Sequence, residues 1–424
     1  MRTFLIKTLG CKVNSYESEF IRNILLDNKF KEVKENADIC IVNTCTVTNT
    51  ADNKSKQAIN NIRKTNPHSI VIAMGCFCQF KSSEIKDIID ADIILGNKYK
   101  SKIVDFINEF EKTKERIIKL EDINESNTPF ENMEVRKFHT HHRAFIKIED
   151  GCNNFCSYCI IPYVRGRVRS KSFNEVLIEV NDLVLSGHKE VVLSGIHTGQ
   201  YNGDNKRLYE LINEMSKIEQ LKRIRLSSVE IVELDEGMMN ILKNDDKFVS
   251  HLHIPLQAGS DKILKLMNRR YDLNYFRDKV KEIRKNRPGI SLSTDVIVGF
   301  PGETEEDFKD TLKFCEEIGF SKIHVFPYSD RTGTVASRMK DKVPGNIKKD
   351  RVHRLLDLSN KLESEYFNSC LDSEVDVLIE EQKEDYYYGF TSNYIPLKLK
   401  GDYKINEIYK LKLKKNMINF DMTD

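Results

Sequence analysis

The sequence contains no long apolar run. Its N-terminus, MRTFLIKTLGCK, has no apolar stretch of signal-peptide length, and no other stretch approaches the roughly 20 apolar residues that span a bilayer. We therefore expect a cytoplasmic protein that does not use a membrane.

The chain also lacks a strong charge of either sign. It carries 67 Lys and Arg against 65 Asp and Glu, so the net charge of +2 gives no sign of a nucleic-acid partner. With 40% hydrophobic and 31% charged residues, its composition excludes fibrous and disordered proteins. Its 424 residues are enough for two or three domains. Ten cysteines in a long chain expected to be intracellular favour metal or redox chemistry over a disulfide scaffold.

Positive charge is nevertheless concentrated in two segments. Residues 136–171 hold eight Lys and Arg against Glu149 and Asp150, and residues 398–415 hold seven Lys against Asp402 and Glu407. Either segment alone is most simply a solvated face. Because one of them surrounds a cysteine motif, the two together favour a polyanionic partner.

The first 120 residues alternate strand and helix patterns. Strands are expected at 2–9, 37–45, 69–76 and 91–97, and a helix at 14–28, where Asn14 and Glu17 have the spacing of a capping box. Such a series predicts a parallel sheet covered by helices.

Three cysteines follow three of these strands. Cys11, Cys45 and Cys76 each lie just past a strand's C-terminal end, the edge at which open parallel sheets bind ligands. We therefore expect these three residues, far apart in sequence, to meet in space.

The rest of the chain divides into a linker and two further domains. Residues 121–137 are polar and without periodicity, which predicts a linker. Residues 138–369 contain a second series of βα units and end in a long helix at 346–369, which predicts a partial (β/α)6 barrel. Residues 370–424 have the pattern of a small β-barrel. The six barrel strands are expected at 144–150, 190–196, 223–230, 251–256, 290–300 and 322–328.

A second cysteine set lies in GCNNFCSYCIIPYVRGR, residues 151–167. Cys152, Cys156 and Cys159 have the spacing C-x3-C-x2-C, whereas a structural zinc site needs four ligands. The upstream residues that could complete a zinc site are His139, His141 and His142. The other reading is an iron–sulfur cube held by three thiolates, with one iron left open for a small molecule.

This spacing, with Tyr158 before the last cysteine and a βα series around it, resembles the radical S-adenosylmethionine superfamily. In that superfamily the cofactor's methionine moiety binds the open iron. Electron transfer then releases a 5′-deoxyadenosyl radical.

The resemblance narrows to the methylthiotransferases and covers essentially the whole chain. TLGCKVN (8–14), NTC (43–45), GC (75–76), HIPLQAGSD (253–261), DVIVGFPGET (295–304) and FPYSDRTGT (326–334) are similar to that family's motifs. GCKVN resembles the branch that methylthiolates C2 of N6-threonylcarbamoyladenosine beside the tRNA anticodon. The last domain lies where the family carries its RNA-binding TRAM barrel.

The resemblance implies two [4Fe-4S] clusters, one on each cysteine set, and S-adenosylmethionine as cofactor. It also implies a tRNA substrate, an electron donor such as flavodoxin or ferredoxin, and a sulfur donor. Cofactor contacts are implied at Tyr158, Ser194, Gly195, Gln257, Val298 and Gly299. The segment GFPGET is equally consistent with a plain turn capped by Thr304.

One departure from the family pattern concerns Cys78, which stands where a small residue is usual and competes with Cys76 as a ligand. We favour Cys76 because it follows Gly75, as the motif requires. The remaining cysteines, Cys40, Cys315 and Cys370, are expected to be structural.

Phosphate contacts are expected from two groups of basic residues. Arg165, Arg167 and Arg169 follow the cluster loop, and Lys410, Lys412 and Lys414 alternate along a strand of the last domain. The alternatives are ion pairs with neighbouring helices for the arginines and an ordinary exposed strand face for the lysines.

Three other functions remain open at this point. The substrate could be isopentenyladenosine in tRNA or a ribosomal-protein side chain, both within the family. A non-catalytic, metal-stabilised RNA-binding protein is the alternative from another class. Such a protein would gain nothing from two three-cysteine sets, because each set lacks the fourth ligand that closes a structural metal site.

Overall fold

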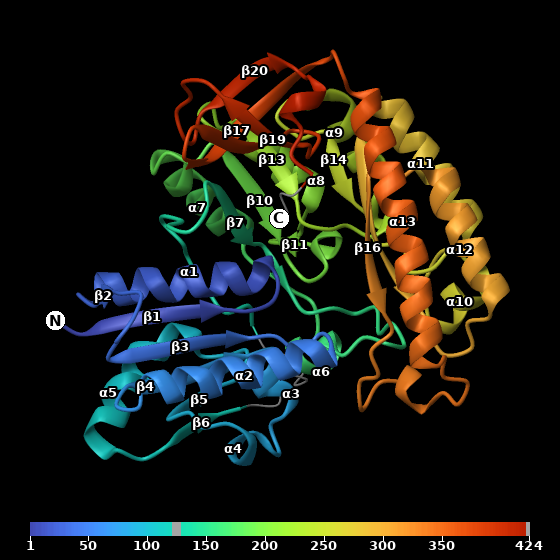
Figure 1. The fold of residues 1–424 in the computed structure, drawn as a ribbon. Helices are drawn as coiled ribbons and strands as arrows, with labels where there is room; N and C mark the ends of the chain where they lie inside the picture. Colours follow the sequence, from blue (N-terminus) through green and yellow to red (C-terminus); the bar gives the residue numbers. More distant parts are fainter. Residues whose placement is uncertain (121–128, 421–424) are drawn as a thin grey trace.

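The computed structural model describes residues 1–120 and 129–420. Its first unit is a parallel sheet with the strand order β2-β1-β3-β4-β5-β6, which confirms the predicted sheet and adds two short strands at its edges (Figure 1). The strands are β1 (Thr3–Thr8), β2 (Lys31–Glu32), β3 (Ile39–Thr44), β4 (Ile70–Gly75), β5 (Ile93–Leu95) and β6 (Ile117–Lys119). Every residue of the central strand β3 is buried, as expected where helices cover both faces.

Helices pack on both faces of this sheet. Those of the unit are α1 (Lys12–Asp27), α2 (Asn49–Thr65), α3 (Cys76–Phe80), α4 (Ile85–Ile88), η1 (Lys100–Lys102) and α5 (Ile103–Thr113). Ile21 and Leu25 of α1 pack in one apolar cluster with one face of the strands, and Ile59 and Ile62 of α2 pack in a second cluster on the other face.

The predicted capping box at the start of α1 is wrong. The helix begins directly after Cys11, which is its N-cap residue. Asn14 instead donates from its side-chain amide to the carbonyl oxygens of Leu9 (2.7 Å) and Thr44 (2.9 Å), and thereby fixes the loops after β1 and β3 against each other.

The second unit is the predicted partial barrel of six parallel strands, formed as two three-stranded sheets that meet at a bridge between Ile224 and Phe248. Its strands are β7 (Arg143–Lys147), β10 (Glu190–Ser194), β13 (Arg223–Leu226), β14 (His251–His253), β15 (Ser291–Val298) and β16 (Lys322–Pro327). The helices are α6 (Ile161–Arg165), α7 (Phe173–Leu185), α8 (Leu208–Ser216), α9 (Glu236–Asn244), α10 (Asp261–Leu266), α11 (Leu273–Asn286), α12 (Glu305–Ile318) and α13 (Gly345–Ser369). Short elements connect them: β8 (Glu149–Asp150), β9 (Arg169–Ser170), β11 (Asn202–Gly203), β12 (Lys206–Arg207), η2 (Thr198–Gln200), η3 (Ile231–Glu233) and η4 (Ala336–Arg338).

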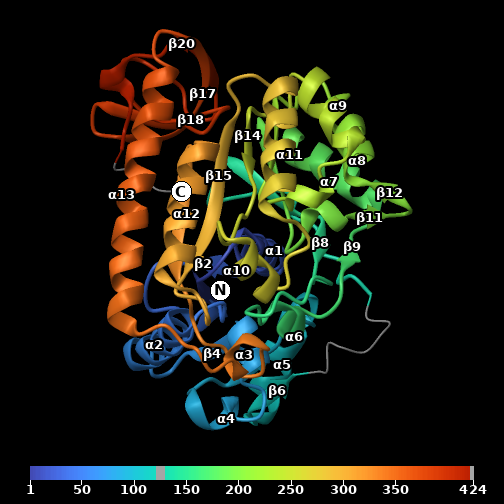
Figure 2. The ribbon, with the colours of Figure 1, turned by 90° about the vertical axis from the view of Figure 1, so that its right-hand side faces the viewer.

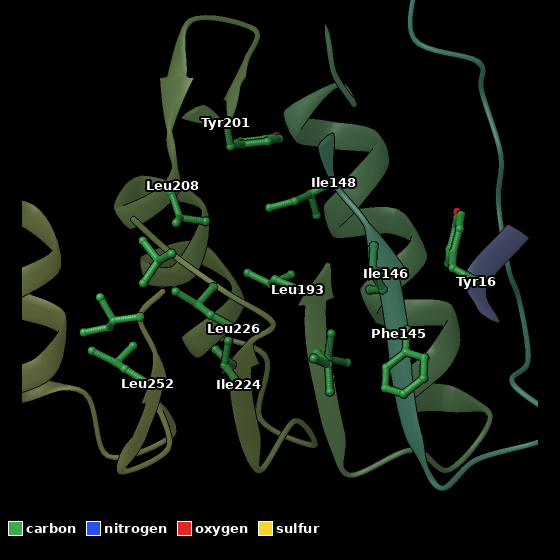
Figure 3. Packing of buried hydrophobic residues seen from close by; sticks show 14 of the residues in the cluster. Tyr16, Phe145, Ile146, Ile148, Leu193, Tyr201, Leu208, Ile224, Leu226 and Leu252 are labelled. Carbon is green, nitrogen blue, oxygen red and sulfur yellow. The ribbon is translucent and has the colours of Figure 1, made fainter. Parts of the chain in front are cut away.

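Successive residues of the barrel strands face opposite sides. Ile146, Leu193 and Leu226, which are in register on β7, β10 and β13, pack toward the covering helices (Figure 3). The other row, with Arg143 and Glu190 in register, faces the barrel interior. The edge strands β7 and β16 leave one side open, and α1 of the first unit packs on β7 beside it (Figure 1). Figure 2, turned by 90°, shows the first unit below the barrel.

The last unit is an antiparallel sheet with the order β19-β18-β17-β20, followed by η5 (Lys415–Met417). Its strands are β17 (Glu374–Lys383), β18 (Tyr386–Thr391), β19 (Pro396–Lys400) and β20 (Ile408–Lys412). The β-rich pattern predicted for this segment is present as these four strands, and a bridge from Leu397 to Ile418 continues the pairing beyond β20.

This last unit lies at the N-terminal ends of the barrel strands, opposite the first unit (Figure 1). Tyr394 stacks on His251 with ring centroids 4.6 Å apart, and the guanidinium of Arg225 lies 4.5 Å from its ring. Arg223 pairs with Asp376 at 2.9 Å. In the part of the chain that the structure describes, no helix is both long and apolar enough to cross a membrane.

The predicted linker spans residues 121–137, and its second part is packed against the barrel. Residues 121–128 lie outside the described residues. Met133 and Val135, however, are fully buried, and the amide of Val135 donates to Glu179 of α7 at 2.8 Å. The segment after residue 128 is therefore a packed part of the junction between the first two units.

A buried ion network joins the first unit to the barrel. Arg165, at the end of α6, pairs with Glu17 of α1 (3.0 Å) and with Asp150 (3.1 Å), and it donates to the side-chain oxygen of Asn14 at 2.8 Å. Lys147 pairs with the same two carboxylates. Burial opposes ionisation of Glu17, but the cations around it outweigh that effect and lower its pKa.

The network corrects the prediction that Arg165 contacts RNA. Its side chain is 0% exposed and has no access to a phosphate in this structure. The ion-pair alternative is the correct one, because the motif's basic pattern does not reveal that acidic side chains of α1 and β8 enclose this arginine.

Replacing Arg165 by Met should destabilise the protein strongly. Glu17 and Asp150 would stay buried with one cation fewer, which costs about 3–5 kcal/mol of unfolding free energy. Urea titration of the metal-free protein measures this loss. The control is Arg167→Met, because Arg167 is exposed and its loss should change stability by less than about 0.5 kcal/mol. Equal stability of the two variants would show that the network does not hold the units together.

Candidate two-cluster site

The first thiol set forms as predicted at one edge of the first sheet. Cys11, Cys45 and Cys76 follow β1, β3 and β4, which are neighbours in the sheet. Gly10, with φ +107°, lies so close to Cys45 that a Cβ at this position would be 2.9 Å from the Cys45 Cβ. A glycine is therefore required before Cys11 for both conformation and space.

Cys76 and Cys78 occupy different environments. Cys76 packs with Ile160 and Val164 of the cluster loop, on the side of the sheet edge that faces the barrel. Cys78 is fully buried among residues under α2, and burial raises the pKa of its thiol to about 12. These positions support Cys76 as the third ligand of the first set and a packing role for Cys78.

The second thiol set lies on the loop that leaves the first barrel strand. The amide of Cys159 donates to the carbonyl of Cys156 at 2.9 Å, which curls the loop. Arg269 donates from Nη1 to the sulfur of Cys156 at 3.3 Å, and the amide of Asn154 donates to the sulfur of Cys152 at 3.4 Å. Hydrogen bonds to sulfur of this kind set the potential of iron–sulfur clusters.

The loops that carry the two sets are in contact at the mouth of the barrel. Ile160, next to Cys159, touches Cys76. The side-chain amide of Asn97 donates both to the carbonyl of Val164 (2.6 Å) and to the sulfur of Cys76 (3.6 Å). A loop of the first unit and the cluster loop of the barrel are therefore fastened together beside both sets.

The donor sets fit iron–sulfur clusters. Each consists of three thiols, and each has a buried arginine beside it: Arg165 near Cys11 and Cys76, and Arg269 on Cys156. These cations would offset the negative charge of three thiolates. Among residues 1–120 and 129–420, no three His, Cys, Asp or Glu side chains are placed to hold a single metal ion.

The residues expected to contact S-adenosylmethionine surround the second set. Ser194 ends β10, and Gly195 lies so close to Glu149 that a Cβ there would be 2.7 Å from Oε2 of that carboxylate. Gln257 pairs through its backbone with β15, and Val298 is the last residue of that strand. Tyr158 packs edge-on against Phe300 at 6.4 Å. All of these are at or near the C-terminal ends of barrel strands, and their roles remain predictions.

The segment GFPGET forms a capped turn. The side chain of Thr304 accepts from the amide of Asp307, and Glu303 accepts from the amide of Gly299 at 3.0 Å. The amide of Gly299 is thus already paired, and a Cβ at this position would clash with the side chain of Lys348.

Three polar residues of the site, His197, Glu149 and Arg269, were not predicted from the sequence. His197 lies 3.5 Å from the sulfur of Cys152 through Nδ1 and pairs through Nε2 with Glu233 at 2.5 Å. Its amide donates to Glu149, a fully buried carboxylate with one oxygen that has no hydrogen-bond partner. Arg269 pairs with Glu230. The histidine two residues after Gly195 was the available signal, but sequence alone does not show that it turns back to the cluster loop.

The basic residues expected to contact RNA lie at two separate places. Arg167 is exposed beside the cluster loop and lies over the ring of Phe155, whereas Arg169 is mostly covered and lies 3.5 Å from Asp150. Lys410, Lys412 and Lys414 are exposed at β20 on the last unit. Lys410 and Lys412 make only exposed ion pairs, with Glu374 (3.7 Å) and Asp372 (3.3 Å).

Two families match parts of the chain. Residues 146–315 match the radical SAM superfamily, and residues 3–96 match the uncharacterised protein family UPF0004. These ranges contain the second and the first thiol set, respectively. Among solved structures, the chain resembles the radical S-adenosylmethionine methyltransferase TsrM of Kitasatospora setae, with a TM-score of 0.56 and 13% identity over 77% of this chain and 75% of that one. At this identity the likeness concerns the fold alone.

Curated relatives match almost the full length. The chain is 40% identical to the threonylcarbamoyladenosine tRNA methylthiotransferase MtaB of Bacillus subtilis, over 98% of this chain and 94% of that one. It is 37% identical to MtaB of Aquifex aeolicus, over 96% and 98%. It is also 35% identical to the tRNA-2-methylthio-N(6)-dimethylallyladenosine synthase of Clostridium perfringens, over 97% and 95%. Because these relatives match almost the whole chain, including both thiol sets, the chain belongs to the methylthiotransferase family of radical S-adenosylmethionine enzymes.

Proposed function

We propose that the protein attaches a methylthio group to C2 of N6-threonylcarbamoyladenosine beside the anticodon of tRNA. The observation that carries the proposal is the contact, at the barrel mouth, between the loops that carry the two three-thiol sets. The substrate follows the names of the relatives that match at 40% and 37% identity. Those named for dimethylallyladenosine match at 35%, which makes that base the second candidate.

The two sets suit two tasks that each need an exchangeable position. When bound, the clusters and S-adenosylmethionine supply the hydrogen-abstracting radical chemistry and the sulfur that a C–H carbon without an acidic proton requires. The chain's own residues hold the cofactors and keep water out. Cys152, Cys156 and Cys159 would hold the cluster that binds S-adenosylmethionine, and Cys11, Cys45 and Cys76 would hold the other.

The surrounding residues orient these groups. Arg269 donates to a ligand sulfur of the second set, and Asn97 donates to one of the first, so both sets have partners outside the ligands themselves. Ser194, Gly195 and the turn before Thr304 frame the cofactor position. The electron donor, such as flavodoxin or ferredoxin, and the sulfur donor belong to this proposal as external partners.

Mass spectrometry of tRNA nucleosides tests the proposal. Cells that lack the protein should lack the methylthio form of threonylcarbamoyladenosine, and the wild-type gene should restore it. Cys152→Ala should restore nothing and should abolish 5′-deoxyadenosine formation by the purified protein. A triple Ala variant of the first set should still cleave S-adenosylmethionine reductively, because the second set lies on another unit, but should give no methylthio product.

The matched control is Cys78→Ala, which removes a buried thiol of the same segment without touching a proposed ligand. It should retain methylthiolation. Loss of product in this variant, with Cys76→Ala still active, would move the third ligand to Cys78. Restoration of the product by Cys152→Ala would contradict the radical mechanism altogether.

The exposed lysines of β20 should contribute to tRNA affinity by pairing with phosphates. Changing Lys410, Lys412 and Lys414 to Gln should weaken tRNA binding at all sequences. It should also reduce the slope of log affinity against log salt by roughly 0.7–0.9 for each phosphate that is no longer neutralised. Filter binding at several salt concentrations measures both quantities. Lys281, Lys309 and Lys313, which are exposed on α11 and α12, provide the control triple change to Gln. A loss of affinity that is the same for both triples would mean that only net charge matters.

A further inference from the structure

A row of polar side chains lines the inner face of the barrel near its mouth. His253 on β14 is in register with Ser293 on β15, and Asp295 two residues further on is in register with His324 on β16. Because alternate residues of a strand share a face, these four side chains lie on one surface. None of them belongs to the thiol sets or to the expected cofactor contacts.

The members of this row are connected to one another. His253 is 3.0 Å from the hydroxyl of Ser293 through Nδ1 and pairs with Asp295 at 3.2 Å through Nε2. The rings of His253 and His324 are 5.6 Å apart. Asp295 keeps 29% of its side chain exposed and His324 is exposed, so the row is open to a ligand.

An exposed aromatic ring continues the same face toward the mouth. Phe326 is in register with Ile297, two residues beyond the pair of Asp295 and His324, and it is 43% exposed. A large apolar ring left open on an inner barrel face next to polar groups is a suitable surface for a stacked base.

The first unit adds a cation to this surface. Lys12 is the first residue of α1 and directly follows Cys11. Its positive charge is among those that act on Asp295 and on His324, although it comes from another unit. Burial opposes ionisation of Asp295, but the hydrogen bond from His253 and the charges of His253, His324 and Lys12 outweigh it and lower its pKa. Burial, together with the charge of His253, lowers the pKa of His324, which favours its neutral form.

We infer that Lys12, His324 and Asp295 recognise a carboxylate-bearing polar group on N6 of the target adenine, while Phe326 stacks on the base. The inference rests on the proposed function and specifies how its substrate is chosen. A threonylcarbamoyl group carries a carboxylate for Lys12, and hydroxyl and urea N–H groups for the acceptors of Asp295 and His324. Its position also follows, since Lys12 adjoins Cys11 and the base must lie beside the first thiol set to receive sulfur.

The same surface discriminates against an apolar substituent. A dimethylallyl group offers no hydrogen bond, so its binding would strip water from Lys12 and Asp295 without replacing it. Sites built to bind a polar substituent reject the analogue that lacks it more strongly than apolar pockets reject a polar one. The selectivity of this chain would therefore come from unsatisfied polar groups as much as from favourable contacts.

The test uses anticodon stem-loops carrying one of three bases: threonylcarbamoyladenosine, its carboxyl methyl ester, or dimethylallyladenosine. The reconstituted wild-type enzyme should prefer the first, and esterification should lower kcat/KM roughly 10- to 100-fold because it removes the charge-assisted hydrogen bond. In Lys12→Met, kcat/KM for the free carboxylate should fall by a similar factor. Esterification should then have almost no further effect, because the two changes remove one interaction.

Two further variants distinguish a loss of substrate recognition from a disruption of the neighbouring cluster by the Lys12 change. His324→Leu changes neither a thiol nor a residue next to one in the sequence. It should also shift the preference toward dimethylallyladenosine, with unchanged iron content and unchanged substrate-free cleavage of S-adenosylmethionine. Lys361→Met is the control away from this face, since Lys361 of α13 pairs with Glu316 of α12 at 2.6 Å, and its preference should stay that of the wild type.

The outcomes separate the two proposals. If the wild-type enzyme does not act on threonylcarbamoyladenosine, the proposed function fails. If it does, but Lys12→Met still loses activity on esterification and His324→Leu keeps the wild-type preference, the function stands and the assigned recognition residues are wrong.

Discussion

The arrangement of this protein depends on a buried ion network that would be unstable if it were incomplete. Arg165 enters from the barrel, Glu17 enters from the first unit, and neither side chain reaches solvent. Separating the units would leave each charge without its partner until water reached it, whereas in the assembled state each is paired and hydrogen-bonded. The network thus opposes any displacement of one parallel sheet relative to the other. It also fixes the two thiol sets, because Arg165 ends the helix that follows Cys159 and contacts Asn14, three residues after Cys11.

That constraint explains why two parallel sheets form a single site. Each sheet alone places its loops at its C-terminal edge, which is where both families of parallel α/β folds bind ligands. Here the two edges are turned toward each other, so that Cys76 touches Ile160 rather than solvent. A mobile connection between the units would place the sets at variable separation, which is incompatible with transfer between them.

The sequence predicted correctly the features that depend on local pattern, such as the strands and the residues that follow them. Strand alternation predicted the parallel sheet in which β1, β3 and β4 are neighbours, and its C-terminal edge predicted the meeting of Cys11, Cys45 and Cys76. It failed where burial is decided by distant segments. Arg165 was expected to face RNA, and Asn14 and Glu17 were expected to cap a helix, yet all three are the buried interface itself. Polar residues near a helix start have the same local pattern in both roles, and only the position of the second unit distinguishes them. The same limit applies to Lys12, whose surroundings include two strands almost 300 residues away in sequence.

The position of the last unit limits what kind of substrate can use the whole surface. Its lysines lie at the N-terminal end of the barrel, whereas both thiol sets lie at the C-terminal end (Figure 1). The eight residues of β15 alone extend over about 26 Å at roughly 3.3 Å per residue. A single nucleoside can contact either the barrel mouth or the lysines, whereas a molecule that contacts both must extend over at least this length. A folded RNA stem that presents one base from its loop meets this requirement, so the separation itself favours a structured tRNA over a free nucleoside.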